Sequence, residues 1–176
     1  AYPVPFGVAI DAIVPVVHPD NSANNLTLQQ LRDIYNGKIT NWKEVGGPDK
    51  PIAVLTRDTS SGTYEVWEEK VMKGDKVTPK AQVMASNGAI VQVVATNQSA
   101  IGYIGIGYLN ESLKGLNVEN IEASVETART GEYPISRYLF MFTRGWPTGE
   151  TMRFSNFVLS DEGQKIVADT GFVPIR

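Results

Sequence analysis

The sequence predicts an α/β protein in which short strands alternate with helices. Runs rich in Val and Ile are typical of strands, and they recur between segments whose apolar residues follow helical spacing. Gly and Pro, with 16 and 10 copies in 176 residues, divide the chain into short elements. Strands and helices that alternate in this way pack in layers around a sheet.

The first element is a strand over residues 8–17, which ends at a turn around His18. Pro15 within this strand indicates a sheet edge or a bend. Asp11 interrupts the apolar run, either as a hinge residue or as an ordinary position on an edge strand. A helix follows at 28–35, where Thr27 and Gln30 have the spacing of a capping box.

The remaining elements follow the same logic. Short apolar runs predict strands at 52–55, 81–85, 100–105 and 134–143. Residues 116–118 and 121–123 are either weak strands or loops. Helical spacing predicts helices at 64–72, 89–95, 148–159 and 162–169. Residues 124–132 carry charges and a glycine, which indicates a loop. We expect the aromatic residues of the later strands to lie in the core: Tyr103, Tyr108, Tyr138, Phe140 and Phe142.

Composition excludes several classes of function. The chain has no cysteine and one histidine, so it offers no thiolate zinc site, no cysteine nucleophile and no multi-histidine metal site. A net charge of -3 argues against a general nucleic-acid binder. We find no base, nucleophile and metal set that would make an enzyme, and expect no cofactor.

The most informative segment joins the strand at 52–55 to the helix that begins near Tyr64. Arg57 supplies a planar cation that suits tetrahedral oxyanions. Ser60, Ser61 and Thr63 add hydroxyl donors, and Gly62 allows an ion to approach the backbone. The first N–H groups of a helix have no internal partner, so these features together predict an anion site.

Simpler interpretations remain open for this loop and for a second one. Ser, Gly and Thr before a helix are often only a turn and an N-cap. The spacing of a P-loop is absent, and so is the elbow of a serine hydrolase. Residues 86–88 also open a helix and could donate N–H groups to a ligand, although simple capping is the more economical interpretation.

Motifs along nearly the whole chain resemble the substrate-binding proteins of phosphate ABC transporters. The resemblance implies a two-lobed, periplasmic-binding-protein-like fold that closes around phosphate outside the cytoplasmic membrane, in the periplasm or at the cell surface, and delivers it to the transporter's membrane subunits. The matching motifs are residues 26–47, Arg57-x-x-x-Ser61-Gly62-Thr63, 86–89, 100–103 and 160–174.

The resemblance also implies which residues bind and how the lobes are divided. Arg57, Ser61, Gly62 and Thr63 would bind phosphate, with Asp58 and Ser60 in possible supporting roles. Residues 10–130 would form one complete lobe. Residues 1–9 and 131–176 would form the hinge and the C-terminal part of an incomplete second lobe.

Members of this family carry an N-terminal segment with a phosphate loop and an aspartate that contacts the ligand, and we find no counterpart in these residues. We therefore expect an exposed apolar patch that the missing segment or a second chain would cover. Phosphate is partly protonated at neutral pH and sulfate is not, so selectivity needs a carboxylate acceptor. With Asp58 as the sole nearby substitute, we expect weak binding and poor discrimination against sulfate.

Two alternatives stay open. The chain could be an interaction or scaffold domain that has lost the complete ligand site. It could also bind another oxyanion, such as sulfate, molybdate or tungstate.

Overall fold

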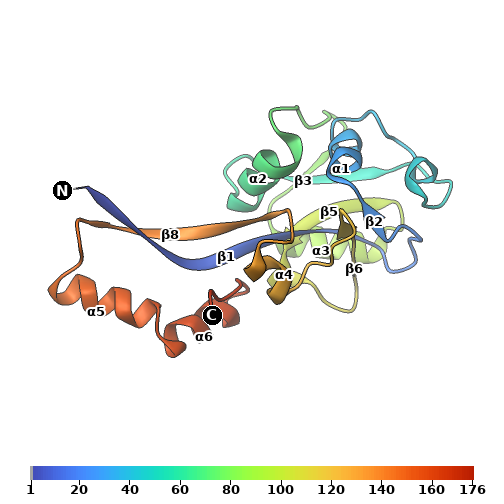
Figure 1. Cartoon of the computed structure of the whole chain (residues 1–176). Coiled ribbons are helices and arrows are strands. Elements are labelled where there is room, and N and C mark those ends of the chain that lie inside the picture. The colour runs from blue at the N-terminus through green and yellow to red at the C-terminus, as the bar shows by residue number, and fades with distance from the viewer. Residues whose placement is uncertain (1) are drawn as a thin grey trace.

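One fifteen-residue strand, β1 (Pro3–Val17), runs through both parts of the molecule. Its first part pairs antiparallel with β8 (Ser136–Arg144), from Pro3 to Ala12, and forms a two-stranded ribbon. Its second part pairs antiparallel with β5 (Ala100–Gly105) and enters the sheet of a globular lobe. The computed structural model describes residues 2–176, and Figure 1 shows the ribbon extending from the lobe.

The lobe is built on a sheet with the strand order β4-β3-β5-β1-β6. The strand β3 (Ala53–Arg57) lies parallel to both β4 (Gln82–Met84) and β5. The strand β1 runs antiparallel to its two neighbours in this sheet, β5 and β6 (Lys114–Gly115). The predicted α/β class is therefore confirmed.

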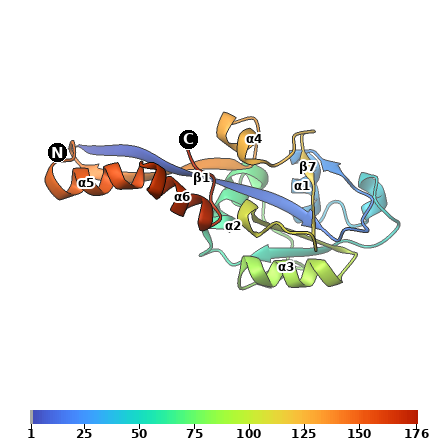
Figure 2. The same cartoon turned by 90° about the horizontal axis from the view of Figure 1, so that it is seen from below.

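Helices cover both faces of this sheet (Figure 2). One core cluster contains Tyr35 of α1 (Leu28–Tyr35) and Trp67 of α2 (Gly62–Trp67), which continues into η2 (Glu68–Met72). A separate cluster packs α3 (Asn87–Thr96) against β1, β3 and β5. The other elements are β2 (Asn25–Leu26), η1 (Trp42–Val45), η3 (Ile106–Tyr108), β7 (Asn117–Val118), α4 (Val125–Thr130), α5 (Gly149–Val158) and α6 (Asp161–Asp169).

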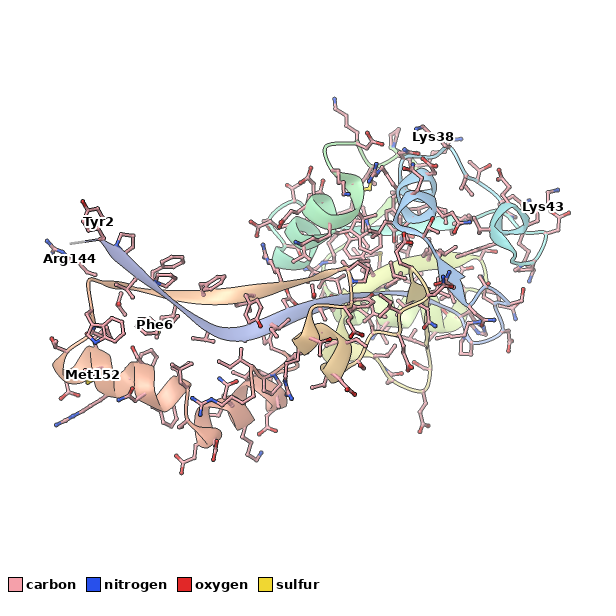
Figure 3. All side chains as sticks on the ribbon, in the orientation of Figure 1. Tyr2, Phe6, Lys38, Lys43, Arg144 and Met152 are labelled. Atoms are coloured by element: carbon pink, nitrogen blue, oxygen red, sulfur yellow. The ribbon has the colours of Figure 1, made fainter. Side chains whose placement is uncertain are left out.

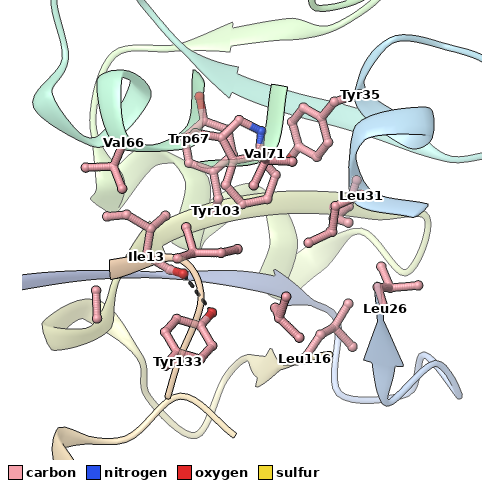
Figure 4. Close-up of a cluster of buried hydrophobic side chains, with 14 of the residues drawn as sticks. Ile13, Leu26, Leu31, Tyr35, Val66, Trp67, Val71, Tyr103, Leu116 and Tyr133 are labelled. Carbon is pink, nitrogen blue, oxygen red and sulfur yellow. Dashed lines mark hydrogen bonds between the residues drawn. The ribbon is translucent and has the colours of Figure 1, made fainter. Parts of the chain in front are cut away.

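Aromatic packing in the first cluster fixes the carboxyl end of β3 (Figure 4). The rings of Trp67 and Tyr103 stack with their centroids 4.3 Å apart. The Tyr103 hydroxyl lies 2.9 Å from Thr56 Oγ1 and accepts a hydrogen bond from the Arg57 amide at 3.0 Å. The loop that follows β3 therefore starts from a rigid, buried anchor.

The structure corrects three expectations. Pro15 does not lie on a sheet edge: it pairs with Tyr103 in a strand that has neighbours on both sides, and β6 begins to pair one residue later, at Val16. Residues 124–132 are not a loop throughout, because Ser124 and Thr127 form a capping box that starts α4.

The third correction concerns the aromatic residues. Tyr103 is buried as expected, but Tyr108, Tyr138, Phe140 and Phe142 are about half exposed or more. The last three follow one another on one face of β8, where the two-stranded ribbon has no further layer to cover them. The expected apolar patch is therefore present on this structure.

The ribbon and the far side of the lobe form the two opposite ends of the molecule. Figure 3 places Phe6 and Met152 at the ribbon end and Lys38 and Lys43 at the opposite end. Within residues 2–176, no helix has the length and hydropathy needed to cross a membrane.

Candidate functional site

The loop between β3 and α2 presents its polar groups to a cavity. Arg57 is the last residue of β3, and Ser61 is the N-cap of α2. The Ser61 hydroxyl accepts a hydrogen bond from the Tyr64 amide at 3.3 Å. Gly62 and Thr63 are the first residues of the helix, so their amides are among those that lack a partner within it.

The cavity beside this loop has a volume of about 330 Å³. It lies where the loop meets the ribbon, the start of α3 and the C-terminal segment. All four residues predicted to bind an anion contribute to its wall. The lining residues are Asp11, Arg57, Ser61, Gly62, Thr63, Asn87, Gly105, Tyr108, Thr170, Gly171 and Phe172.

Arg57 lines this cavity and has a hydrogen-bond donor without a partner among residues 2–176. Its side chain is only 12% exposed, and its buried Nε has no hydrogen-bond partner within residues 2–176. Its Nη2 lies 3.5 Å from the carbonyl oxygen of Ala85 and 3.9 Å from Asp58 Oδ2. A buried guanidinium with an unpaired donor is costly unless a ligand accepts from it.

Asp58 and Ser60 lie outside the wall of the cavity. The Asp58 carboxylate accepts hydrogen bonds from the Ser60 amide at 3.1 Å and from the Ser60 hydroxyl. The hydrogen bond from the Ser60 side chain holds the pKa of Asp58 below its usual value, with smaller contributions from backbone N–H groups and from Arg57. Both residues shape the loop, and their supporting role stays a prediction.

Three residues at the site were not among those predicted to bind. Asp11 reaches the cavity from β1, and Asn87 reaches it from the first turn of α3. Arg137 of β8 lies directly opposite Asp11 in the ribbon. Its Nη2 donates to Glu65 Oε2 at 3.1 Å and to the Gly62 carbonyl at 3.4 Å, so it ties the ribbon to α2.

Sequence signals existed for two of these residues. Asp11 stands out as a charge within an apolar strand, and Asn87 belongs to a helix-opening motif. The structure shows that Ser86 caps α3, as the simple interpretation expected. Asn87 also lines the cavity, and its buried Oδ1 has no hydrogen-bond partner among residues 2–176. Nothing in the local pattern around Arg137 indicated its contact with α2.

The described residues 2–176 contain no group of three or more His, Cys, Asp or Glu side chains that could hold a metal ion. The donors around the cavity are guanidinium, hydroxyl and amide groups. This donor set suits an oxyanion better than a cation.

Known proteins similar to this chain share a function class. The chain is 35% identical over 180 residues to the phosphate-binding protein PstS of Borreliella burgdorferi and 32% identical over 170 residues to that of Bacillus subtilis. Each match covers 96% of this chain, and it covers 64% and 56% of the two relatives, respectively. The chain therefore spans little more than half to just under two thirds of these relatives.

Solved structures similar to this chain belong to the same function class. A putative phosphate ABC transporter substrate-binding protein from Clostridium perfringens, solved with bound phosphate, matches with a TM-score of 0.85 and 36% identity over 99% of this chain and 72% of its own. An ABC-type phosphate transport receptor from Vibrio cholerae matches with a TM-score of 0.89 and 34% identity over 97% of this chain and 72% of its own. The family model described as the PBP superfamily domain matches residues 4–162. This chain belongs to the PBP superfamily.

Proposed function

We propose that this chain binds inorganic phosphate in the cavity beside residues 57–63, as the binding component of a phosphate ABC transporter. The observation that carries the proposal is the buried Arg57 Nε, which has no partner within residues 2–176 and belongs to a side chain lining the cavity with Ser61, Gly62 and Thr63. Arg57 would supply charge and planar donors, and the hydroxyls and amides would complete the contacts. The relatives named for phosphate binding support the choice of ligand.

The proposal includes a location and a partner. The binding component would work in the periplasm or at the outer surface of the cell, and would deliver phosphate to the membrane subunits. Its role is binding without a catalytic step, like that of the transport proteins it resembles.

The proposed lobes meet along β1. Residues 10–130 would form the complete lobe, and residues 1–9 and 131–176 would belong to the other one. In the structure β1 changes its pairing partner from β8 to β5 between Ala12 and Ile13, close to this proposed boundary.

We further propose that additional polypeptide covers the exposed face of the ribbon. Tyr138, Phe140 and Phe142 are each at least half exposed there, and uncovered apolar patches of this kind are typical of interfaces. In both PstS relatives described above, more than a third of the length lies outside the region that matches this chain. A segment equivalent to that region, N-terminal by the resemblance, is the proposed cover, and a second copy of this chain is the alternative outcome.

Calorimetry with inorganic phosphate on the full chain tests the ligand proposal. We expect Arg57→Ala to weaken binding by about 10- to 100-fold, since a hydrogen bond to a charged group contributes about 1.5–3 kcal/mol. Arg153→Ala is the matched control, because Arg153 is 81% exposed and its ion pair is with Glu150 on the same helix. It should bind like the unchanged protein.

The same experiment separates the alternatives. A scaffold domain would show no saturable heat and no thermal shift with phosphate, sulfate or molybdate, with or without Arg57. A site built for another oxyanion would bind sulfate or molybdate more tightly than phosphate. Either result would overturn the phosphate proposal.

A further inference from the structure

Arg137 connects the ribbon to the helix that forms part of the cavity wall. It is the second residue of β8, and its Nη2 donates to the Gly62 carbonyl oxygen at 3.4 Å and to Glu65 Oε2 at 3.1 Å. Gly62 opens α2 and lines the cavity, whereas Arg137 itself lies outside that wall. Arg137 therefore acts on the cavity through α2 and not through contact with a ligand.

The stability of α2 alone does not account for a cation at this place. The amino end of a helix carries a partial positive charge, which repels a cation beside its first turn. Glu65 in the first turn offsets that repulsion, but its side chain is 69% exposed, and that of Arg137 is 24% exposed. An ion pair with one largely exposed partner contributes little to stability.

The guanidinium of Arg137 is also incompletely satisfied. Its buried Nε has no hydrogen-bond partner among residues 2–176. A buried donor without a partner costs stability. The contact is therefore better explained by what it holds in place than by a gain in stability.

Arg137 holds the start of α2, where core packing does not. The buried residues of this helix are Val66 and Trp67, which lie beyond its first residues. Gly62 is exposed and has no side chain that could pack. The first peptide group of the helix is therefore held from the side by the hydrogen bond from Arg137.

That hydrogen bond also sets the direction of a donor in the cavity wall. The Gly62 carbonyl and the Thr63 N–H belong to one planar peptide group, and in a trans peptide they point in opposite directions. Fixing the carbonyl oxygen therefore fixes the direction of the Thr63 N–H. A cation on the carbonyl oxygen also polarises the peptide group, which makes its N–H a stronger donor.

We propose that Arg137 is a positioning residue of the anion cavity, which holds the Gly62 carbonyl and thereby aims the Thr63 N–H at the bound anion. This inference rests on the proposed function, because Gly62 and Thr63 are among the residues proposed to bind phosphate. Since Arg137 belongs to β8, the aim of this donor is coupled to the position of the ribbon.

Calorimetry with inorganic phosphate on the full chain and on Arg137→Gln gives the first test. Gln keeps part of the aliphatic stem but lacks the charge and the reach of the guanidinium. We expect phosphate binding to weaken by about 10-fold, because a donor to the anion loses its alignment. Arg144→Gln is the matched control: it removes the same charge from an exposed position at the other end of β8 and should leave the affinity unchanged.

Glu65→Ala separates positioning from simple attraction between charges. If Arg137 acted only as a cation near the anion, removal of the carboxylate that neutralises it would tighten phosphate binding. If Arg137 acts by holding α2, loss of Glu65 loosens the guanidinium, and we expect binding to weaken by about 2- to 5-fold. Glu69→Ala removes an exposed carboxylate that pairs with Lys70 in η2, and it should have no effect.

Amide spectra of the ¹⁵N-labelled protein distinguish positioning from a purely structural role. Saturating phosphate should displace the Thr63 amide resonance in the unchanged chain. In Arg137→Gln, also saturated and shown to be folded by circular dichroism, this displacement should be clearly smaller. A purely structural role would lower the free energy of unfolding and leave the displacement unchanged.

Failure of this inference and failure of the proposed function are distinguishable. If the unchanged chain shows no saturable phosphate binding, the proposed function falls and the inference falls with it. If the chain binds phosphate, three results would overturn the role of Arg137 alone: an unchanged affinity in Arg137→Gln, tighter binding by Glu65→Ala, or an unchanged Thr63 displacement. Should Arg137→Gln fail to fold, Glu65→Ala carries the test, because its side chain is largely exposed.

Discussion

Asp11 lies in the wall of the cavity at a cost in stability. Burial raises the pKa of its carboxyl, with the opposing charge of Arg137 as the smaller effect. A group whose pKa is higher in the folded than in the unfolded chain contributes stability below its unfolded pKa, near 4, and that stability is lost as the pH rises through the folded pKa. At neutral pH the ionised carboxylate therefore destabilises the ligand-free protein.

Asp11→Asn should consequently be more stable than the unchanged chain at neutral pH in the absence of ligand. This gain in stability should shrink as the pH falls to 4 and below, where the Asp11 carboxyl becomes protonated in both the folded and the unfolded chain. The two proteins then become alike. Urea unfolding at pH 4 and pH 7 in phosphate-free buffer measures the difference. An advantage that grows toward acid pH would contradict this account of the Asp11 environment.

Residues 57–63 could be proposed as a candidate site from the sequence because they are contiguous. A cation, small hydroxyl residues and a glycine directly before a helix are visible in one short window. Asp11, Asn87 and Arg137 reach the same region from three other elements. Long-range features of the fold, such as the pairing of β1 with β8, bring them together, and no local spacing encodes these contacts.

At the level of elements, the cavity wall depends on a close approach between two loops. A Cβ placed on Gly107 in η3 would lie 2.3 Å from the Cα of Gly171 and 2.6 Å from its carbonyl oxygen. Both obstructing atoms are backbone, so a larger residue forces one segment to move. Gly171 has a φ of +88° and lines the cavity with Thr170 and Phe172.

Gly107→Ala should therefore displace the C-terminal wall of the cavity. We expect a loss of about 1–3 kcal/mol in the free energy of unfolding, the usual cost of overpacking. Phosphate affinity should fall in the same variant, measured by calorimetry. Gly88→Ala is the control, because its nearest neighbour, Ser86 Oγ, would lie at an ordinary 3.7 Å. A Gly107→Ala protein with unchanged stability and affinity would refute this role.

Most of the lobe's elements were predictable from the sequence, whereas α4 was not. Strands and helices with strong apolar periodicity were found close to their observed positions, as with β5 and α1. The capping box of α4 uses Thr127 where a Glu or Gln is the usual signal. A helix of six residues also offers too few positions for a periodic pattern.

At the scale of the whole molecule, one face of the ribbon lacks the covering layer that an α/β architecture normally supplies. The sequence indicated strongly apolar residues in β8 but could not show which face a partner covers. Phe140 and Phe142 are 52% and 63% exposed, and their ring centroids lie 6.3 Å apart. Adjacent exposed aromatic rings on one face of a two-stranded ribbon favour association with another apolar surface.

We therefore expect this chain, studied alone, to self-associate with increasing concentration and to bind an apolar dye. Replacing both Phe140 and Phe142 by Ser should reduce both effects. Stability should change little, by about 0.5 kcal/mol per site or less, because the two rings are already largely in solvent. Val83→Ser removes an exposed apolar residue (62% exposed) from β4 of the lobe and serves as the control, with no effect on association expected. Sedimentation velocity over a concentration series gives the answer. A chain that stays monomeric throughout and binds no dye would show that the face is stable in water, and would remove the reason to propose a covering segment.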